Sequence, residues 1–208
     1  DVNILCLLDR GPLSYAEVDG VQREIHAAVA RGEEPDTLIV WQAKDVYTAG
    51  RRTRPEDVPD PSVPVVEVDR GGSVTYHGPG QVIVYPIVRV RLPKDVVAFV
   101  RAVEAAVIEA LSTFGVRGER IAGRSGVWVG GEKICAVGLK FASDTTMHGL
   151  ALNVTTDVSK FFRVNPCGIT DAGVTSMERQ GVDASLEEAA AALTSALGKH
   201  LASFQQER

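Results

Sequence analysis

Hydrophobic residues recur along three segments of the chain at the three-to-four-residue spacing of an amphipathic helix. These segments cover residues 14–32, 95–115 and 185–201. The first and the third open with a serine and a glutamate three residues apart, which is the spacing of a capping box. An aspartate suited to capping opens the second, and glycines end the first two. The pattern therefore predicts three helices, each with one apolar face to bury.

Shorter apolar runs predict the strands between and around these helices. We expect strands at residues 2–8, 37–42, 63–69, 81–90, 126–131, 134–140 and 149–155. The first run is apolar enough to predict a buried strand, and Pro86 places the fourth near a sheet edge or a bulge. The segment between the second and third runs contains prolines and an arginine cluster, which predicts a long exposed loop.

Strand runs flanked by amphipathic helices predict an α/β fold, an α+β sandwich in which helices flank a mixed sheet. The 208 residues are enough for one domain with a substantial core. No repeat, low-complexity tract or linker divides the sequence, so we expect residues 1–208 to form a single domain. The pattern does not predict which strands run parallel.

Composition and charge narrow the functional classes. Hydrophobic residues at 45% and charged residues at 24% are ordinary for a globular protein. A formal net charge of -5 argues against general nucleic-acid binding, which needs a clustered basic surface. No apolar run approaches the roughly 20 residues of a membrane span. Three cysteines without a CxxC pair argue against a disulfide framework or a zinc site and favour a reducing, cytoplasmic location.

The motifs of several common mechanisms are missing from the chain. There is no Walker A phosphate loop, no GxGxxG turn opening a helix, no HExxH pair and no GxSxG elbow. Mechanisms based on ATP, dinucleotides or zinc therefore lose support. We expect no cofactor and no metal.

The densest unusual stretch is RGGSVTYHGPGQ at residues 70–81. Its four glycines allow backbone conformations and close approaches that other residues resist. An arginine, two hydroxyl residues, a tyrosine and a histidine lie between them, which is suited to binding the polar head of a ligand. A glycine-rich hairpin between two strands explains the glycines equally well. Composition leaves both interpretations open.

Cys167 lies in the sequence Asn-Pro-Cys-Gly, which predicts a tight turn that holds the thiol on a loop. Buried, inert cysteines are the commoner kind, and we expect Cys6 and Cys135, inside apolar strand runs, to be of that kind. A free thiol with a pKa near 8.5 is only about 3% thiolate at pH 7, so a reactive cysteine needs a cation or base beside it. Spacing does not decide among the candidates for this partner, which are His77, His148 and Lys133.

Five motifs, in this order, resemble those of the octanoyltransferases, also called lipoyl(octanoyl) transferases or lipoate-protein ligase B. They are RGGSVTYH with GPGQ at 70–81, KIC at 133–135, HGLALN at 148–153, NPCG at 165–168 and VTS at 174–176. The resemblance extends from about residue 50 to residue 177. It implies the fold of the biotin and lipoate protein ligase catalytic domain.

The resemblance also implies a reaction and the residues that perform it. An octanoyl group would move from acyl carrier protein to a lysine of a lipoyl domain, the first step of endogenous protein lipoylation. Cys167 corresponds to the nucleophile that carries the acyl group as a thioester, and Lys133 to the residue that lowers the thiol pKa. The substrate-binding stretches correspond to Arg70, Gly71, Gly72, Ser73, Val74, Thr75, Tyr76, His77, Ala136, Val137, Gly138, Gly149, Leu150 and Ala151.

The implied partners are proteins. The donor is octanoyl-acyl carrier protein, and the acceptors are lipoyl-domain proteins such as 2-oxoacid dehydrogenase E2 subunits and the glycine cleavage H protein. Both kinds of partner are acidic in this family. Two arginine clusters, at residues 51, 52 and 54 and at residues 117, 120 and 124, are therefore either docking surfaces or ordinary solvated charges. The rival functions are an ATP-dependent lipoate or biotin ligase and a non-catalytic acyl-binding protein on the same fold.

Overall fold

Seven strands form the main sheet of the computed structural model, which describes residues 1–51, 53–70, 74–162 and 173–207. In spatial order they are β1 Asn3–Cys6, β2 Thr37–Trp41, β6 Gln81–Ile87, β10 Thr145–Asn153, β9 Glu132–Ala142, β8 Arg124–Val129 and β7 Glu119–Ile121. β1 and β2 pair in parallel, and the other neighbours in this sheet are antiparallel. A small second sheet has the order β4 Val65–Glu67, β3 Val46–Ala49, β5 Val74–His77.

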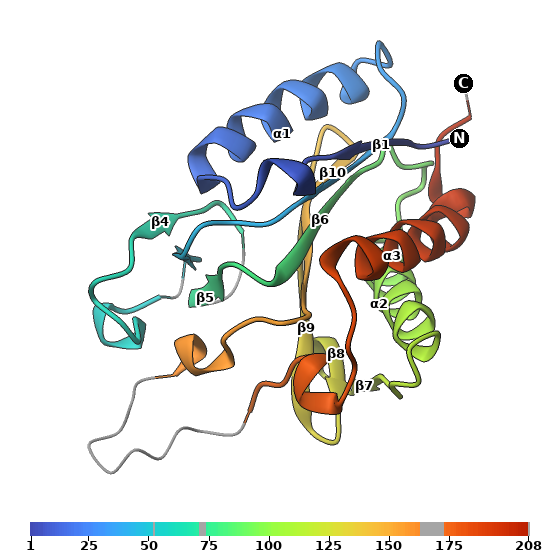
Figure 1. The fold of residues 1–208 in the computed structure, drawn as a ribbon. Helices are drawn as coiled ribbons and strands as arrows, with labels where there is room; N and C mark the ends of the chain where they lie inside the picture. Colours follow the sequence, from blue (N-terminus) through green and yellow to red (C-terminus); the bar gives the residue numbers. More distant parts are fainter. Residues whose placement is uncertain (52, 71–73, 163–172, 208) are drawn as a thin grey trace.

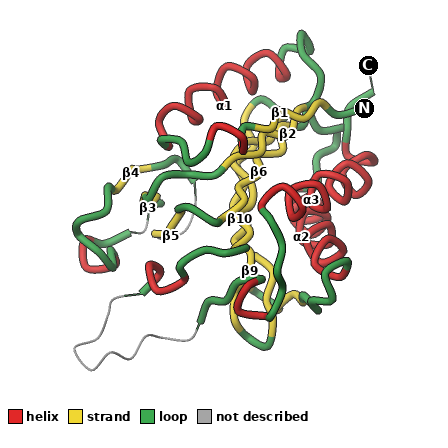
Figure 2. The backbone as a smooth tube through the Cα atoms, viewed as in Figure 1, coloured by secondary structure: helices red, strands yellow, loops and turns green. Residues whose placement is uncertain are grey.

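Helices cover both faces of the main sheet (Figures 1 and 2). α1 (Tyr15–Ala30) lies on one face, and α2 (Val96–Ser112) and α3 (Leu186–Leu201) pack together on the other. Short 3-10 helices occupy Leu8–Arg10, Pro55–Asp57, Val158–Phe161, Glu178–Gln180 and Ala202–Phe204. The predicted sandwich, with a mixed sheet flanked by helices, is confirmed.

The alternation of side chains along the central strands separates two hydrophobic clusters. On β6, Val82 and Val84 join the cluster under α2 and α3, whereas Ile83, Tyr85 and Ile87 join the cluster under α1. β2 alternates in the same way. Successive residues of a strand point to opposite faces, so a continuous apolar run supplies both layers of the core.

The predicted helices begin where the sequence indicates. Ser14, Asp95 and Ser185 each accept a hydrogen bond from the backbone N–H three residues later, at 3.3, 3.0 and 3.0 Å. At the start of α3 the glutamate side chain returns a bond to the serine N–H and completes a capping box. These caps satisfy donors that a helix start otherwise leaves unpaired.

Two strand expectations are wrong. β1 is an edge strand that is largely exposed, with Ile4 at 55% exposure, because it has a strand neighbour on one side only. Cys6 is exposed with it, against the expectation of a buried thiol. The segment expected to be a long loop contains β3, whose four residues are all buried. Its sequence, VYTA, is too short and too mixed to predict a strand, and its pairing with β4 and β5 makes it one.

Pro86 lies inside the main sheet, with β2 and β10 on either side of its strand, so the expected edge position is also wrong. The missing N–H is tolerated because the β6–β10 register ends at Val84 and Leu150, two residues before the proline. Beside this interruption His148 adopts a φ of 58°, in the left-handed region. The local break resembles the bulge that the sequence offered as the alternative, and it lies next to the largest concentration of motif residues.

Candidate active site

A cavity of about 330 Å³ lies on the α1 side of the main sheet, lined by residues of both sheets and of α1. Its volume is at the small end of the range usual for small-molecule sites. It brings together many sequence-predicted residues: Arg70, Val74, Thr75, His77, Lys133, Ala136, Val137, Gly138, Gly149, Leu150 and Ala151. The rest of the wall comes from His148, one of the candidate thiol partners, and from residues that the sequence did not single out: Tyr15, Thr48, Ile83, Tyr85 and Ser125.

Some predicted residues do not take part in this wall. Gly71, Gly72, Ser73 and Cys167 lie outside the described residues. Tyr76 points elsewhere: its ring packs against Tyr47 and Phe161 at centroid distances of 5.7 and 5.4 Å, and its hydroxyl bonds the carboxylate of Asp45. Burial and this bond raise the pKa of Tyr76. Tyr76 therefore fixes β5 from behind the cavity.

Small residues on two paired strands form one wall. Ala136 faces Ala151 and Gly138 faces Gly149 in the β9–β10 register. A Cβ at Gly149 would lie 2.2 Å from the Val84 carbonyl oxygen, so the close approach of β10 to β6 requires glycine there. A Cβ at Gly138 would meet only the Cδ of Arg70, at 3.7 Å. Glycine at 149 is a packing requirement, whereas glycine at 138 keeps space open.

Arg70 reaches from the end of the β4 segment into the cavity wall. Its Nη2 donates to the carbonyl oxygen of Thr48 at 2.8 Å and to the Thr48 hydroxyl at 2.9 Å. Burial lowers the pKa of Arg70, yet a guanidinium stays charged at any physiological pH. Arg70 thus gives the cavity a fixed positive charge.

A partly buried polar network holds the neighbouring segment. The Asp69 carboxylate pairs with Lys140 Nζ at 2.6 Å, His148 Nε2 at 3.0 Å and Arg23 Nη2 at 3.2 Å. Burial alone would raise the pKa of Asp69, but these three hydrogen bonds outweigh it and hold the pKa well below its usual range. The His148 backbone N–H also donates to the buried Gln22 side chain on α1, at 2.7 Å. The network ties α1, β9 and β10 to the residue that precedes Arg70.

Lys133 lines the cavity from the start of β9. Its Nζ lies 4.9 Å from the centre of the Trp128 ring, a cation–π distance. Burial lowers the pKa of Lys133, and the nearby Arg124 guanidinium lowers it further. The Lys133 backbone is held on both sides, because its N–H donates to Gly173 O and its carbonyl accepts from Thr175 N–H, each at 2.9 Å. A lysine with a lowered pKa and a fixed backbone is suited to accept a proton.

The two cysteines that the structure describes are poor candidates for chemistry at this site. Cys135 is fully buried, as expected, and burial raises the pKa of its thiol to about 12. Cys6 is exposed on β1, the edge strand of the main sheet that lies furthest from β9. Neither combines an accessible thiol with a place in the cavity wall.

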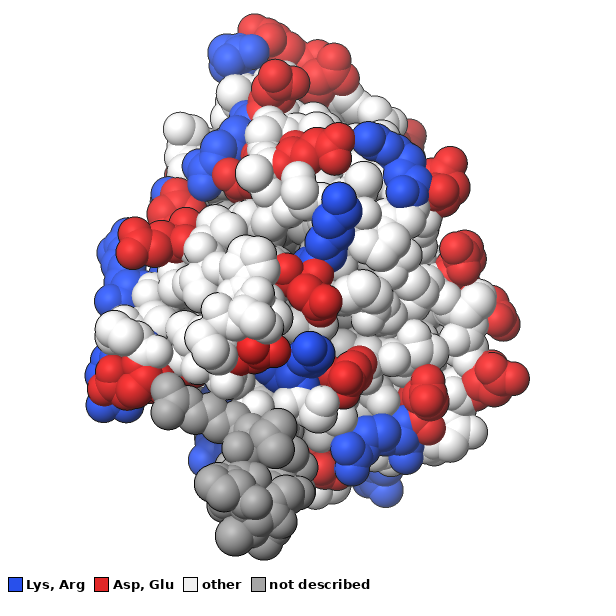
Figure 3. Space-filling model, turned by 60° about the vertical axis from the view of Figure 1, so that its left-hand side comes forward, with Lys and Arg blue, Asp and Glu red and all other residues white. Residues whose placement is uncertain are grey.

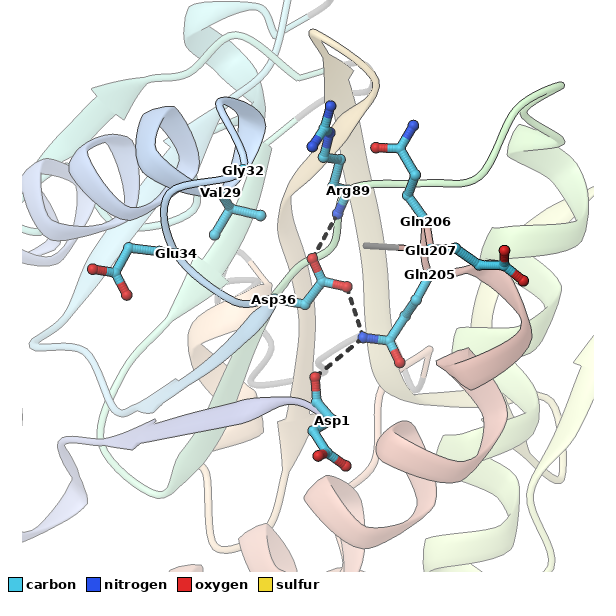
Figure 4. Close-up of a pocket in the computed structure, with 9 residues that line it drawn as sticks. All are labelled: Asp1, Val29, Gly32, Glu34, Asp36, Arg89, Gln205, Gln206 and Glu207. Carbon is cyan, nitrogen blue, oxygen red and sulfur yellow. Dashed lines mark hydrogen bonds between the residues drawn. The ribbon is translucent and has the colours of Figure 1, made fainter.

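A second, more polar cavity of about 390 Å³ lies near the described chain ends (Figure 4). The Asp36 carboxylate accepts the Arg89 backbone N–H at 3.0 Å and the Gln205 side-chain amide at 2.7 Å. The same amide contacts the Asp1 carbonyl oxygen at 3.4 Å. These bonds fasten the C-terminal segment to the sheet, and the motif residues lie in the other cavity.

The arginine clusters make local ion pairs. Arg54 contacts Asp57 and Glu56 at 3.1 and 3.7 Å, and Arg120 contacts the buried Glu104 at 3.4 Å. Arg52 lies outside the described residues. On the face that Figure 3 turns forward, lysines and arginines are interspersed with acidic residues. A docking role for these clusters stays a prediction.

In the described part of the chain, no group of three or more histidine, cysteine, aspartate or glutamate side chains lies suitably to hold a metal ion. No helix within those same residues is long and apolar enough to cross a membrane.

Comparison with known proteins identifies the family. Residues 14–198 match the family described as the lipoyl protein ligase A/B catalytic domain. An octanoyltransferase of Thermobifida fusca (strain YX) is 46% identical over 180 residues, which are 82% of this chain and 76% of that protein. Two solved structures share the fold. A bipartite lipoate protein ligase from Thermoplasma acidophilum has a TM-score of 0.73 at 16% identity and covers 100% of this chain and 86% of its own. A biotin protein ligase from Aquifex aeolicus has a TM-score of 0.61 at 13% identity, covering 98% and 72%.

The family match spans most of the chain, and the cavity gathers many of the motif residues that the structure describes. This chain belongs to the lipoyl protein ligase A/B catalytic-domain family and, within it, to the octanoyltransferases.

Proposed function

We propose that this enzyme transfers an octanoyl group from the thioester of acyl carrier protein to a lysine of a lipoyl domain, through an acyl-thioester on Cys167. Lys133 accepts the thiol proton. No nucleotide is needed, because exchange of one thioester for another is nearly isoenergetic. Acceptors of this class are the E2 subunits of 2-oxoacid dehydrogenases and the glycine cleavage H protein, and we infer a cytoplasmic location.

The two backbone hydrogen bonds between Lys133 and residues 173 and 175 are the observation that carries this proposal. Cys167 precedes Gly173 by six residues in the sequence. A chain of that length spans at most about 22 Å even when fully extended, since each residue adds at most about 3.6 Å. The covalent connection therefore supports a thiol within reach of the cavity that Lys133 lines.

The proposed reaction has two steps. In the first, Lys133 Nζ takes the Cys167 proton, the thiolate attacks the carrier thioester, and the carrier sulfur leaves with that proton. In the second, the amine of the target lysine attacks the acyl-enzyme, the Cys167 sulfur leaves, and one amine proton passes to that sulfur to restore the thiol. The lowered pKa of Lys133 supports its role, because a neutral amine is required to accept a proton.

The cavity wall supports an alkyl substrate. Ala136 and Ala151 offer small apolar side chains, Ile83 adds apolar surface, and Gly138 leaves room beside them. Each buried methylene contributes about 0.8 kcal/mol, so a chain of eight carbons binds usefully while one methylene discriminates weakly. Arg70 lies at the same cavity and is suited to a polar or anionic part of the donor.

Intact-mass spectrometry after mixing the enzyme with octanoyl-acyl carrier protein tests the covalent route. We expect one added octanoyl group in the wild type and none in Cys167→Ser. Cys6→Ser is the matched control, because it removes an exposed thiol on the far strand of the sheet and should still be acylated.

The rival functions give different results. An ATP-dependent ligase would stay largely active as Cys167→Ser and would require ATP. A protein that forms no adduct with any acyl donor would be a binding protein. Either result would overturn the proposed mechanism.

A further inference from the structure

Two buried amides link His77 to the segment beside Lys133. The His77 Nδ1 lies 2.8 Å from Gln81 Oε1. The Gln81 Nε2 donates to Asn153 Oδ1 at 2.9 Å and to the Tyr76 carbonyl oxygen at 3.3 Å. Asn153 Nδ2 then donates to the Thr175 carbonyl oxygen at 3.1 Å. Gln81 and Asn153 are 1% and 3% exposed, so water does not compete for these bonds.

Two backbone carbonyls determine the direction of the whole series. A carbonyl oxygen only accepts, so Thr175 O requires the NH₂ of Asn153 and turns the Asn153 oxygen towards Gln81. That oxygen and Tyr76 O both require the NH₂ of Gln81, which turns the Gln81 oxygen towards His77. The His77 Nδ1 must therefore donate, and it carries the ring proton.

The second ring nitrogen of His77 is consequently an acceptor. Burial, with the positive charge of Arg70 and the neighbouring His148, lowers the pKa of His77 to about 4, despite the opposing bond to Gln81. The neutral ring holds one proton, which is on Nδ1, so Nε2 has a lone pair. Among the described residues the ring makes its hydrogen bond at Nδ1 and its face stacks on Tyr15 at 6.4 Å. Because His77 lines the cavity, Nε2 is left for a bound ligand.

The charged side chains of the cavity and its second imidazole are engaged differently. Arg70 is a donor in every state, and Lys133, which accepts only while its amine is neutral, is already assigned to the Cys167 proton. His148 also lines the cavity, but its Nε2 bonds Asp69 at 3.0 Å. A ligand N–H that enters the cavity beside the Arg70 guanidinium finds a neutral acceptor at His77. Such surroundings repel an ammonium group and favour an uncharged amine.

We propose that His77 is the hydrogen-bond acceptor that orients the attacking lysine amine, and that Gln81 and Asn153 are positioning residues that hold its ring in the Nδ1–H form. This rests on the proposed acyl transfer. The amine lone pair forms the new C–N bond while the thioester C–S bond breaks with its electron pair on sulfur. The N–H proton passes through Nε2 to the departing thiolate, so one thiol and one amide result and His77 is unchanged.

Nitrogen NMR of histidine-labelled enzyme tests the ring state without any substrate. The chain has four histidines, and loss of one pair of signals in His77→Asn assigns that residue. We expect a neutral Nδ1–H ring from pH 5 to 8. Gln81→Glu should keep the proton on His77 Nδ1, because a carboxylate can only accept, and its negative charge should raise the pKa of His77. Gln81→Leu should mix the two tautomers. An Nε2–H ring in the wild type, or an unchanged ring in Gln81→Leu, would overturn the assignment.

The reaction test separates the two chemical steps. His77→Asn keeps a donor for Gln81 but lacks Nε2, so acylation by octanoyl-acyl carrier protein should persist by intact mass. The single-turnover rate constant for transfer from the isolated acyl-enzyme to a lipoyl domain should fall at least about tenfold. His200→Gln, on α3, is the control and should match the wild type. Unchanged transfer in His77→Asn, or equal loss of both steps, contradicts the proposal. Failure of the wild type to form the acyl-enzyme would instead contradict the acyl-transfer mechanism and leave the NMR result intact.

Discussion

On β6, Val82 and Val84 face α2 and α3, whereas Ile83 and Tyr85 face α1 and the cavity. The α2/α3 side is a close-packed apolar layer, and Phe99, Val103 and Leu193 there are completely buried. The α1 side contains an apolar cluster too, but beside it lie the cavity and the polar network. Adjacent residues of one strand therefore serve stability on one face and chemistry on the other.

Phe99→Ala is the substitution expected to have the largest effect on the α2/α3 side, and it tests whether that face serves stability alone. The ring is fully buried and makes edge contacts with Phe141 and Phe204 at 5.6 and 5.4 Å. We expect the free energy of unfolding to fall by about 3–5 kcal/mol, because a large cavity is left. Urea denaturation measures this. The acyl-transfer rate per folded molecule should stay unchanged, and an equal loss of that rate would show that the two faces are not separable.

On the cavity side, Lys133→Met should lower the transfer rate and leave the free energy of unfolding nearly unchanged. Methionine keeps an apolar chain over Trp128 but lacks the amine. We expect the octanoyl-transfer rate to fall by about 10²–10⁴-fold, with the free energy of unfolding changed by at most about 1 kcal/mol. Single-turnover kinetics and denaturation together check this. Lys199→Met on α3, which removes an exposed ion pair with Glu109, is the control. Retention of the full rate would remove Lys133 from the mechanism.

Two glycines of the cavity wall sharpen the distinction further. A Cβ at position 138 would meet only Arg70 Cδ, at an ordinary contact distance of 3.7 Å, so Gly138→Val should give a stable enzyme whose added methyl groups favour a shorter acyl chain. Losing room for two methylenes shifts the ratio of hexanoyl to octanoyl use by about tenfold, at about 0.8 kcal/mol each. Gly149→Ala, by contrast, forces a contact with the Val84 carbonyl and should lower stability. Competition between the two acyl donors and thermal unfolding measure these effects, and an unaltered chain preference in Gly138→Val would argue against acyl binding there.

The most gradual effect is on the pH dependence of stability. His77 has a pKa of about 4 in the folded protein and about 6.5 when unfolded. As pH falls below about 6.5, the unfolded chain gains a proton that the native ring refuses, so stability declines until about pH 4. Asp69, with a lowered pKa, loses its contribution only at more acidic pH. Burial lowers the pKa of His148 as well, so that ring adds to the same decline. His77→Asn should therefore reduce the slope of stability against pH between pH 6.5 and 4 in urea titrations, and an unchanged slope would contradict the neutral ring.

Local patterns account for the helices and for most strands. Each helix combined an apolar stripe with a capping residue, and both signals act within a few residues of one another. β3 and the exposure of β1 could not be predicted in this way. A strand of four residues is stabilised by its neighbours, and an edge position depends on how many neighbours are present.

Among the cavity residues, Gly138, Gly149, Arg70, His77 and Lys133 were predicted, whereas Tyr15 and Tyr85 were not. The alternation of side chains on β6 places Tyr85 on the same face as Ile83, two residues earlier. That alternation predicts a place in the cavity wall only when β6 is known to pair with β10. Tyr15 comes from α1, which is remote in sequence from the motifs that it joins.

By itself, the sequence determined the layers of this protein, the family of its motifs and the identity of Cys167 as the candidate nucleophile. Only the tertiary structure decided which residues share a cavity, and which candidate partner has which chemistry. His77, His148 and Lys133 looked equivalent in the sequence. The hydrogen bond from His77 Nδ1 to Gln81 leaves the other ring nitrogen of His77 as an acceptor, whereas His148 Nε2 is bonded to Asp69. The Lys133 backbone is held by its hydrogen bonds to residues 173 and 175. Those contacts join residues up to about eighty positions apart, and no local pattern encodes them.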